Sequence, residues 1–244
     1  MAIKRFLYCA DSHGDLIHDE SRRKLLKFAA EWKPHYRIHG GDLWDFAALR
    51  GGASPEDKAN GISEDYAAGM KFLDEYKPDF LTLGNHDDRI WQHANNSRDG
   101  ILKEHCAALV RASEEEFKRR NISFIPYVVG KYLQLPEGGP KFIHGFRSSN
   151  VSPAKLHHGD WGSCIHGHVH KPDTYVATHV DGGMSMSAGC IGDIDAMSYA
   201  NRFPAKMGWR QGWIYGTINE RTGSWHAWHV LKEGDDWISP MGNL

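Results

Sequence analysis

The chain has 244 residues, a formal net charge of −2, 26 glycines and 16 histidines. Its hydrophobic content of 41% and charged content of 25% exclude a disordered, collagen-like or coiled-coil protein. Because 29 basic side chains nearly cancel 31 acidic ones, the overall charge provides no attraction to nucleic acid or to an anionic membrane. At roughly 100 to 200 residues per domain, the length predicts a single domain over 1–244.

The four cysteines are scattered along the chain without a CxxC pair. Such spacing fits neither a zinc ribbon nor a small disulfide framework, and it indicates a reducing compartment. The apolar run that begins at Ile3 is too short for a signal peptide, and no later run approaches about 18 apolar residues. We therefore expect a soluble, cytoplasmic protein without a membrane partner.

The first half of the chain alternates strands with helices. Short apolar, β-prone runs predict strands at 3–9, 36–39 and 80–83, and each of them leads into a polar loop. Apolar residues at helical spacing predict a helix that opens at Ser21 and stops at Pro34. Ser54 and Ser63 resemble helix starts, and further helices are predicted at 101–110 and, from a capping-box pattern, at 113–120.

The second half of the chain is rich in strands. Runs of Val, Ile, Tyr and Trp between Gly and Pro turns predict strands at 123–129, 132–135, 141–144, 164–166 and 174–178, and a hairpin of 212–219 with 224–231. The change from alternating strands and helices to a strand-rich half predicts an α/β, layered α+β fold: a two-sheet β-sandwich flanked by helices. Residues 171–244 would complete the sandwich.

Polar side chains follow the predicted strands. Asp11 and His13 stand two residues apart after the first strand, and on extended backbone such residues point to the same side. Asp42 follows the second strand after a Gly-Gly pair, which lets backbone segments approach closely. Carboxylate and imidazole groups at neighbouring strand ends can reach one ion.

Four more candidate ligands follow later strands: Asn85, His144, His168 and His170. Four Asp, Asn or His ligands with water suit one divalent first-row ion, whereas seven suit two ions that share a carboxylate. Two ions about 3.5 to 4 Å apart can clamp a phosphate, generate hydroxide near neutral pH and stabilise both apical oxygens of an in-line displacement. Phosphoester hydrolysis is therefore the favoured chemistry.

The ordered set Asp-x-His, Gly-Asp, Gly-Asn-His-Asp, His and Gly-His-x-His resembles the calcineurin-like metallophosphoesterase superfamily over residues 11–170. The resemblance implies attack by a metal-bridging hydroxide and the following metal ligands: for one ion Asp11, His13, Asp42 and His170, and for the other Asp42, Asn85, His144 and His168. It also implies that His86 donates a hydrogen bond or a proton to the phosphate or leaving group, with Asp87 orienting it.

Several neighbouring residues have alternative interpretations. His144 is preferred over His157 and His158, because it ends a predicted strand and precedes a glycine. His39 and His166 adjoin the motifs, and they are candidates for hydrogen bonds that support a ligand.

Three charged residues near the motifs are further candidates. Asp45 can orient a ligand, bind substrate or cap the next helix. Arg89 and Arg147 follow motif loops and can neutralise a substrate phosphate, although solvated surface charge is the common role of such residues.

The leading function is hydrolysis of a phosphodiester in a nucleotide or small diester, with nucleic acid as a further substrate class. Two divalent ions are expected, Mn²⁺ first, with Fe, Zn²⁺, Co²⁺ or Ni²⁺ as alternatives. A phosphomonoesterase or protein phosphatase is the first alternative, and a DNA nuclease or a metal-free scaffold is a further one. The near-neutral charge does not favour the nuclease, and no ligand is missing as a scaffold would require. The oligomeric state stays open.

Overall fold

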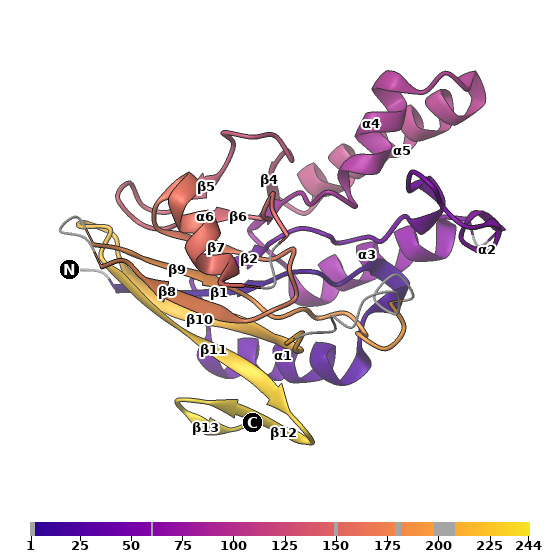
Figure 1. Ribbon diagram of the computed structural model, residues 1–244. Coiled ribbons are helices and arrows are strands. Elements are labelled where there is room, and N and C mark those ends of the chain that lie inside the picture. Colours follow the sequence, from indigo (N-terminus) through magenta and orange to yellow (C-terminus); the bar gives the residue numbers. More distant parts are fainter. Residues whose placement is uncertain (1–2, 60, 149–150, 179–181, 198–207) are drawn as a thin grey trace.

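The computed structural model describes residues 3–59, 61–148, 151–178, 182–197 and 208–244 (Figure 1). Its strands are β1 (Ile3–Cys9), β2 (Tyr36–His39), β3 (Phe80–Thr82), β4 (Ser123–Ile125), β5 (Leu133–Gln134), β6 (Lys141–Ile143), β7 (Cys164–His166), β8 (Asp173–Val176), β9 (Met184–Ser187), β10 (Gly212–Asn219), β11 (Trp225–Glu233), β12 (Asp236–Ser239) and β13 (Gly242–Asn243). Its helices are α1 (Asp19–Trp32), α2 (Pro55–Ala59), α3 (Ser63–Tyr76), α4 (Asp88–Asn96), α5 (Gly100–Arg119) and α6 (Pro153–Trp161), with 3₁₀ turns η1 (Gly14–Leu16) and η2 (Ala47–Leu49).

These strands form two mixed sheets. One has the order β13-β12-β11-β10-β1-β2-β3-β4, with β1 to β4 parallel and β10 antiparallel to β1. The other has the order β5-β6-β7-β9-β8, with β6, β7 and β9 parallel and the two edge strands antiparallel. Figure 1 shows α1 and α3 on one outer side and α6 on the other. The predicted α/β class, with two sheets flanked by helices, is confirmed.

Strand β1 explains how the layers are held together. Successive side chains on a strand point to opposite faces, and β1 is apolar on both. Leu7 and Cys9 belong to the cluster that contains Phe28 of α1, whereas Phe6 packs in a second cluster, with its ring centroid 5.4 Å from that of Phe142. Each fully buried side chain of this size contributes about 1.5 to 3 kcal/mol of transfer free energy. One strand therefore anchors both cores.

Helix α1 begins two residues before the predicted position. Its N-cap is His18, whose Nδ1 accepts a hydrogen bond of 3.3 Å from the backbone N–H of Ser21. The prediction that Ser21 opens the helix is wrong, because a histidine side chain fulfils the capping role three residues earlier.

The helices predicted at 101–110 and 113–120 are one continuous helix, α5. Ser113 is buried inside it, and its hydroxyl donates a 3.3 Å hydrogen bond to the hydroxyl of Tyr66 on α3. The capping-box prediction fails because a tertiary partner satisfies the serine, so no helix end is needed. Helices α4 and α6 and strands β9, β12 and β13 were not expected from the sequence. No helix in the described part of the chain is both long and apolar enough to cross a membrane.

Candidate metal centre

The loops that follow the strand ends are joined through their backbones. The N–H of Asp11 donates to the carbonyl of Gly41 at 2.9 Å, and the N–H of His13 donates to the carbonyl of Asp42 at 3.0 Å. In the second sheet the N–H of Gly167 donates to the carbonyl of His144 at 2.8 Å. Because parallel strands end at the same edge of a sheet, these loops carry the candidate ligands to one place.

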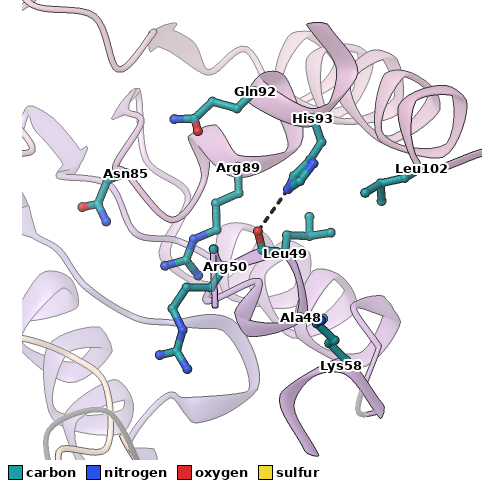
Figure 2. A pocket seen from close by; sticks show the side chains of 10 residues that line it. Ala48, Leu49, Arg50, Lys58, Asn85, Arg89, Gln92, His93 and Leu102 are labelled. Carbon is teal, nitrogen blue, oxygen red and sulfur yellow. Dashed lines mark hydrogen bonds between the residues drawn. The ribbon is translucent and has the colours of Figure 1, made fainter. Parts of the chain in front are cut away.

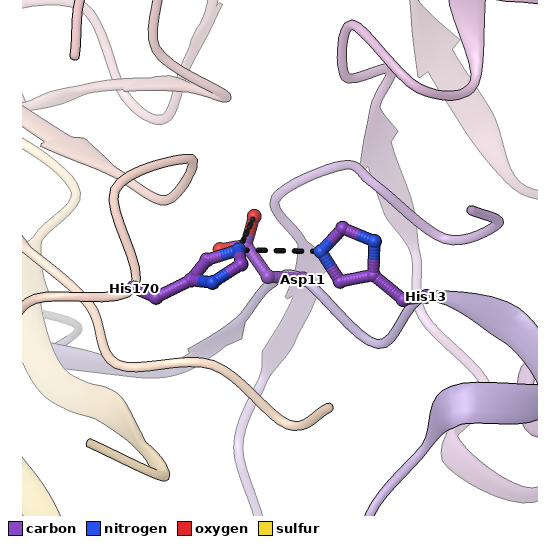
Figure 3. A group of neighbouring side chains, drawn as sticks. All are labelled: Asp11, His13 and His170. Carbon is purple, nitrogen blue, oxygen red and sulfur yellow. Dashed lines mark hydrogen bonds and ion pairs between the residues drawn. The ribbon is translucent and has the colours of Figure 1, made fainter. Parts of the chain in front are cut away.

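One group of candidate ligands consists of Asp11, His13 and His170 (Figure 3). The Nε2 atom of His170 lies 3.4 Å from Asp11 Oδ1 and 3.2 Å from the Nε2 atom of His13. All three side chains are buried. The structure therefore brings the first and last motifs together, 157 residues apart in sequence.

A second group consists of Asp42, His144 and His168. The Nε2 atom of His144 lies 3.2 Å from Asp42 Oδ2 and 3.1 Å from Asn85 Oδ1. Asp42 thus lies with the second group and not with the first, and the assignment of ligands to two ions stays a prediction. His144 lies in the group, whereas His157 accepts a hydrogen bond from the backbone N–H of Phe146 at 3.2 Å.

The hydrogen bonds of the ring nitrogens indicate a cation. His144 Nδ1 lies 2.8 Å from the carbonyl oxygen of Gly40, so it carries the proton, and the lone pair of Nε2 would then face two acceptor oxygens, of Asp42 and Asn85. This contact is repulsive until a proton or a metal ion lies between them. In the described part of the chain the buried Nδ1 of His168 has no hydrogen-bond partner, which makes it available as a ligand. The donor set thus fits divalent cations.

Charge in the site also favours a cation. Burial acts to lower the pKa of His144, but the charge and hydrogen bond of Asp42, together with Asp11 and the carbonyl of Gly40, raise this pKa to about 9. Burial likewise opposes protonation of His13, yet the hydrogen bond and charge of Asp45, together with the charges of Asp42 and Asp11, raise its pKa to about 8. Burial acts to raise the pKa of Asp42, while the neighbouring histidines hold it well below its usual range. The carboxylates therefore stay ionised and attract positive charge.

The candidate ligands sit on left-handed backbone. Positive φ angles, where side chains with a Cβ are disfavoured, occur at Asp11 (58°), His13 (52°), Asp42 (49°), His168 (73°) and His170 (54°). The prediction that extended backbone aligns the two residues of each i, i+2 pair is wrong, since β1 and β7 end before the ligands and the loops curl. Such conformations cost of order 1 to 3 kcal/mol each and cluster at functional sites.

Two glycines allow this close packing. Gly41 has a φ of 92°, and a Cβ there would lie 2.6 Å from the backbone nitrogen of Gly84 and 2.8 Å from His144 Nδ1. A Cβ on Gly84 would collide with the carboxylate of Asp42. The glycines of the motifs therefore make room for the ligands.

His86 lies beside the second group and is oriented by Asp45. Its Nδ1 is 2.8 Å from Asp45 Oδ1, and its Nε2 is 3.9 Å from Asp42 Oδ2. Asp45 Oδ1 also lies 3.1 Å from His13 Nδ1. Sequence reasoning had offered this role for Asp45 only as one of several, because a carboxylate three residues after a motif has no specific pattern.

The prediction that Asp87 orients His86 is wrong. The Asp87 carboxylate accepts hydrogen bonds from the backbone N–H groups of Trp44, at 3.0 Å, and Gly84, at 2.8 Å. It is fully buried and ties two motif loops together. His86, the neighbour of Asp87 in sequence, is thus oriented by the carboxylate of Asp45 from another loop.

Two histidines next to the motifs support the loops. His39 Nε2 lies 3.1 Å from the hydroxyl of Ser12, and its Nδ1 accepts from the N–H of Gly41 at 3.2 Å. His166 stacks on His157 with ring centroids 3.8 Å apart. Both side chains are buried.

The two arginine candidates lie in different surroundings. Arg89 donates to the backbone carbonyls of Asp45 and, at 3.2 Å, Phe46, and it lines a cavity of about 620 Å³ (Figure 2). Arg147 forms an ion pair of 2.8 Å with Asp160 and is exposed. A substrate contact of Arg147 stays a prediction.

Comparison with known proteins gives structural neighbours only. No family model matches the chain, and no curated protein sequence does. One solved structure is a conserved uncharacterized protein from Streptococcus pneumoniae TIGR4, described as a predicted phosphoesterase; it is 12% identical, covers 100% of this chain and 94% of its own, and has a TM-score of 0.39. The protein TT1561 of Thermus thermophilus is 13% identical, covers 93% of this chain and 98% of its own, and has a TM-score of 0.40. Likenesses of this degree add no weight to a functional assignment, which rests on the side chains of the site.

Proposed function

We propose that the protein is a divalent-metal-dependent phosphoesterase that hydrolyses phosphodiester bonds in a nucleotide or small diester. The observation that supports this proposal is the convergence of two His/Asp groups on one buried site, with His86 beside them. Seven mixed carboxylate, amide and imidazole donors exceed the need of one ion. Two ions that share Asp42 account for all of them.

The proposed ligand sets follow the two groups. Asp11, His13, Asp42 and His170 would hold one ion, and Asp42, Asn85, His144 and His168 the other. When bound, two such ions polarise a phosphoryl oxygen and activate water as the nucleophile. Mn²⁺ is the first metal that we propose to test; the donor set contains no thiolate and is suited to several divalent first-row ions.

His86 is the proposed proton donor to the leaving group. Its Nδ1 faces two acceptors of Asp45, the carboxylate at 2.8 Å and the carbonyl at 3.1 Å, so Nδ1 carries a proton. The proton that can move is therefore on Nε2, the atom that faces the site near Asp42. Burial lowers the pKa of His86, although Asp42 and Asp45 oppose it. The protonated ring would give up its proton readily to a departing alkoxide.

The cavity beside Asn85 and Arg89 supports a diester substrate over a monoester. Its volume of about 620 Å³ leaves room for the second ester group, which a monoester lacks. Arg89 would contribute positive charge near the phosphoryl group.

Initial rates on bis-p-nitrophenyl phosphate and p-nitrophenyl phosphate test the proposal, with protein reconstituted in Mn²⁺ and with a chelated control. We expect metal-dependent hydrolysis of both and faster hydrolysis of the diester. A clear preference for the monoester would instead identify a phosphomonoesterase. No hydrolysis with any of the five metals, despite stoichiometric binding, would refute phosphoesterase activity.

A further inference from the structure

The cavity of about 620 Å³ next to the metal centre carries a concentration of positive charge. It lies between the segment of η2 and α2 on one side and α4 with the start of α5 on the other (Figure 2). Three basic side chains line it: Arg50, Lys58 and Arg89. Among the described residues that line the cavity none is acidic, and the carboxylate that pairs with Arg50, that of Asp57, lies outside the lining.

The basic side chains are held in place by neighbours outside the cavity lining. Arg50 Nη2 donates to Asp57 Oδ2 at 2.7 Å, which anchors one edge of the guanidinium and leaves further N–H donors on the group. Arg89 is anchored through the carbonyls of Asp45 and Phe46. Both guanidinium groups are thus positioned before any ligand arrives, which lowers the entropic cost of binding an anion.

The two walls of the cavity are tied together. His93 Nε2 of α4 lies 3.0 Å from the carbonyl oxygen of Leu49 in η2, a contact drawn in Figure 2. Leu49 and Leu102 add apolar surface to the lining. A mostly preformed cavity that combines apolar walls with a few fixed charges is typical of a small-molecule site.

The cavity adjoins the candidate metal centre at Asn85. Asn85 lines the cavity, and its Oδ1 lies 3.1 Å from His144 Nε2 in the second ligand group. In Figure 2 the guanidinium groups of Arg50 and Arg89 lie on the same side as Asn85, while Lys58 and Leu102 lie on the other. A substrate whose reacting phosphate is at the metal centre would therefore place its next groups in this cavity.

We infer that the cavity binds a second phosphate of the substrate, one that is not cleaved, so that the substrate class is a small nucleotide-like molecule with two separate phosphate groups. This inference rests on the proposed function and narrows its substrate class. Arginine forks pair with phosphate oxygens through parallel N–H donors, and Lys58 adds a point charge at the exposed side. Arg50 and Lys58 are then specificity-determining residues that do not touch the reacting atoms.

Isothermal titration with two ligands tests the inference without relying on catalysis. Thymidine 5′-monophosphate and thymidine 3′,5′-bisphosphate are compared on metal-free and Mn²⁺-loaded full-length protein. We expect the bisphosphate to bind about tenfold more tightly, the effect of one additional charge-assisted pair. In Arg50→Ala this gain in affinity shrinks to about twofold or less, whereas Arg50→Lys retains part of it; Lys58→Ala, on the other side of the cavity, reduces the gain by a smaller factor.

Lys71→Ala is the matched control, because it removes the same charge from an exposed position of α3 that does not line the cavity. The Lys71→Ala variant should keep the full gain in affinity for the bisphosphate over the monophosphate. Circular dichroism checks that every variant is folded. Equal binding of both ligands, binding of neither, or a gain that survives both alanine substitutions would overturn the inference. An affinity that keeps rising from the bisphosphate to a longer oligothymidylate would assign the cavity to a nucleic acid strand and overturn the small-substrate class. Bisphosphate preference without hydrolysis of any phosphoester would leave the cavity assignment standing and refute the proposed function.

Discussion

The buried Asp45 and the partly buried His86 form a pair in which the carboxylate oxygen Oδ1 lies 2.8 Å from the ring nitrogen Nδ1. The same oxygen lies 3.1 Å from Nδ1 of His13, and the two imidazole rings meet edge to face with centroids 4.8 Å apart. One carboxylate therefore orients a proposed metal ligand and the proposed proton donor together. Loss of this carboxylate should affect metal binding and proton transfer in the same variant.

Asp45→Asn tests this coupling. The amide cannot stabilise an imidazolium as a carboxylate does, so we expect kcat to fall about 10- to 100-fold, with weaker metal binding as well. The measurements are the pH profile of kcat and the metal content after dialysis. Asp88→Asn is the matched control, since Asp88 accepts a hydrogen bond from Gln92 on the same helix. An unchanged pH profile in Asp45→Asn would contradict the positioning role.

Asp42→Ala and His86→Ala should separate metal binding from proton transfer. Asp42 is the proposed shared ligand, so its loss should abolish activity and release both ions. His86→Ala should lower turnover about 10²- to 10⁴-fold while the metal content stays close to that of the unsubstituted protein. Metal analysis of the two purified variants checks this. Equal metal loss in both would refute the division of roles.

The stability of the metal-free protein should fall as the pH rises above neutrality. The pKa of His13 is raised to about 8 and that of His144 to about 9, against about 6.5 in an unfolded chain. Between roughly pH 6.5 and 9 the folded chain then binds more protons than the unfolded one, so the free energy of unfolding decreases with pH.

Mn²⁺ should remove this loss, because the metal takes the place of the protons. Thermal unfolding midpoints across this pH range, with chelator and with Mn²⁺, measure the effect. A metal-free midpoint that rises with pH, or a midpoint that Mn²⁺ leaves unchanged, would contradict the assignment of these histidines as ligands.

Gly84→Ala should impair metal binding while the fold is retained. The added Cβ would collide with Asp42 Oδ1 and with the backbone nitrogen of Asp42, so both the carboxylate and its loop must shift from their positions beside His144. We expect a loss of at least about tenfold in metal affinity, as for a ligand that is displaced. Gly159→Ala, on the exposed face of α6 with no atom near its added Cβ, is the control. Titration of both variants with Mn²⁺ measures the metal affinity. An affinity in Gly84→Ala as high as in Gly159→Ala would contradict the prediction.

The sequence by itself determined the strands that deliver the site. The bounds predicted for 3–9, 36–39, 164–166 and 212–219 match β1, β2, β7 and β10. Apolar and β-branched periodicity is a local property, and so are the Gly and Asp residues that end each strand. The candidate ligands could be named for the same reason, since each of them stands at the end of a predicted strand or within four residues after it.

Only the tertiary structure decided which side chains support one another. Asp45 rather than Asp87 holds His86, although Asp87 is adjacent in sequence, and Arg50 faces the same cavity as Arg89. The curled, left-handed loops and the continuous helix α5 likewise departed from the local pattern. These features depend on contacts between residues that are distant in sequence, such as His144 with Gly40, 104 residues apart. Such contacts are set by how the two sheets and their loops pack, which no window of sequence contains.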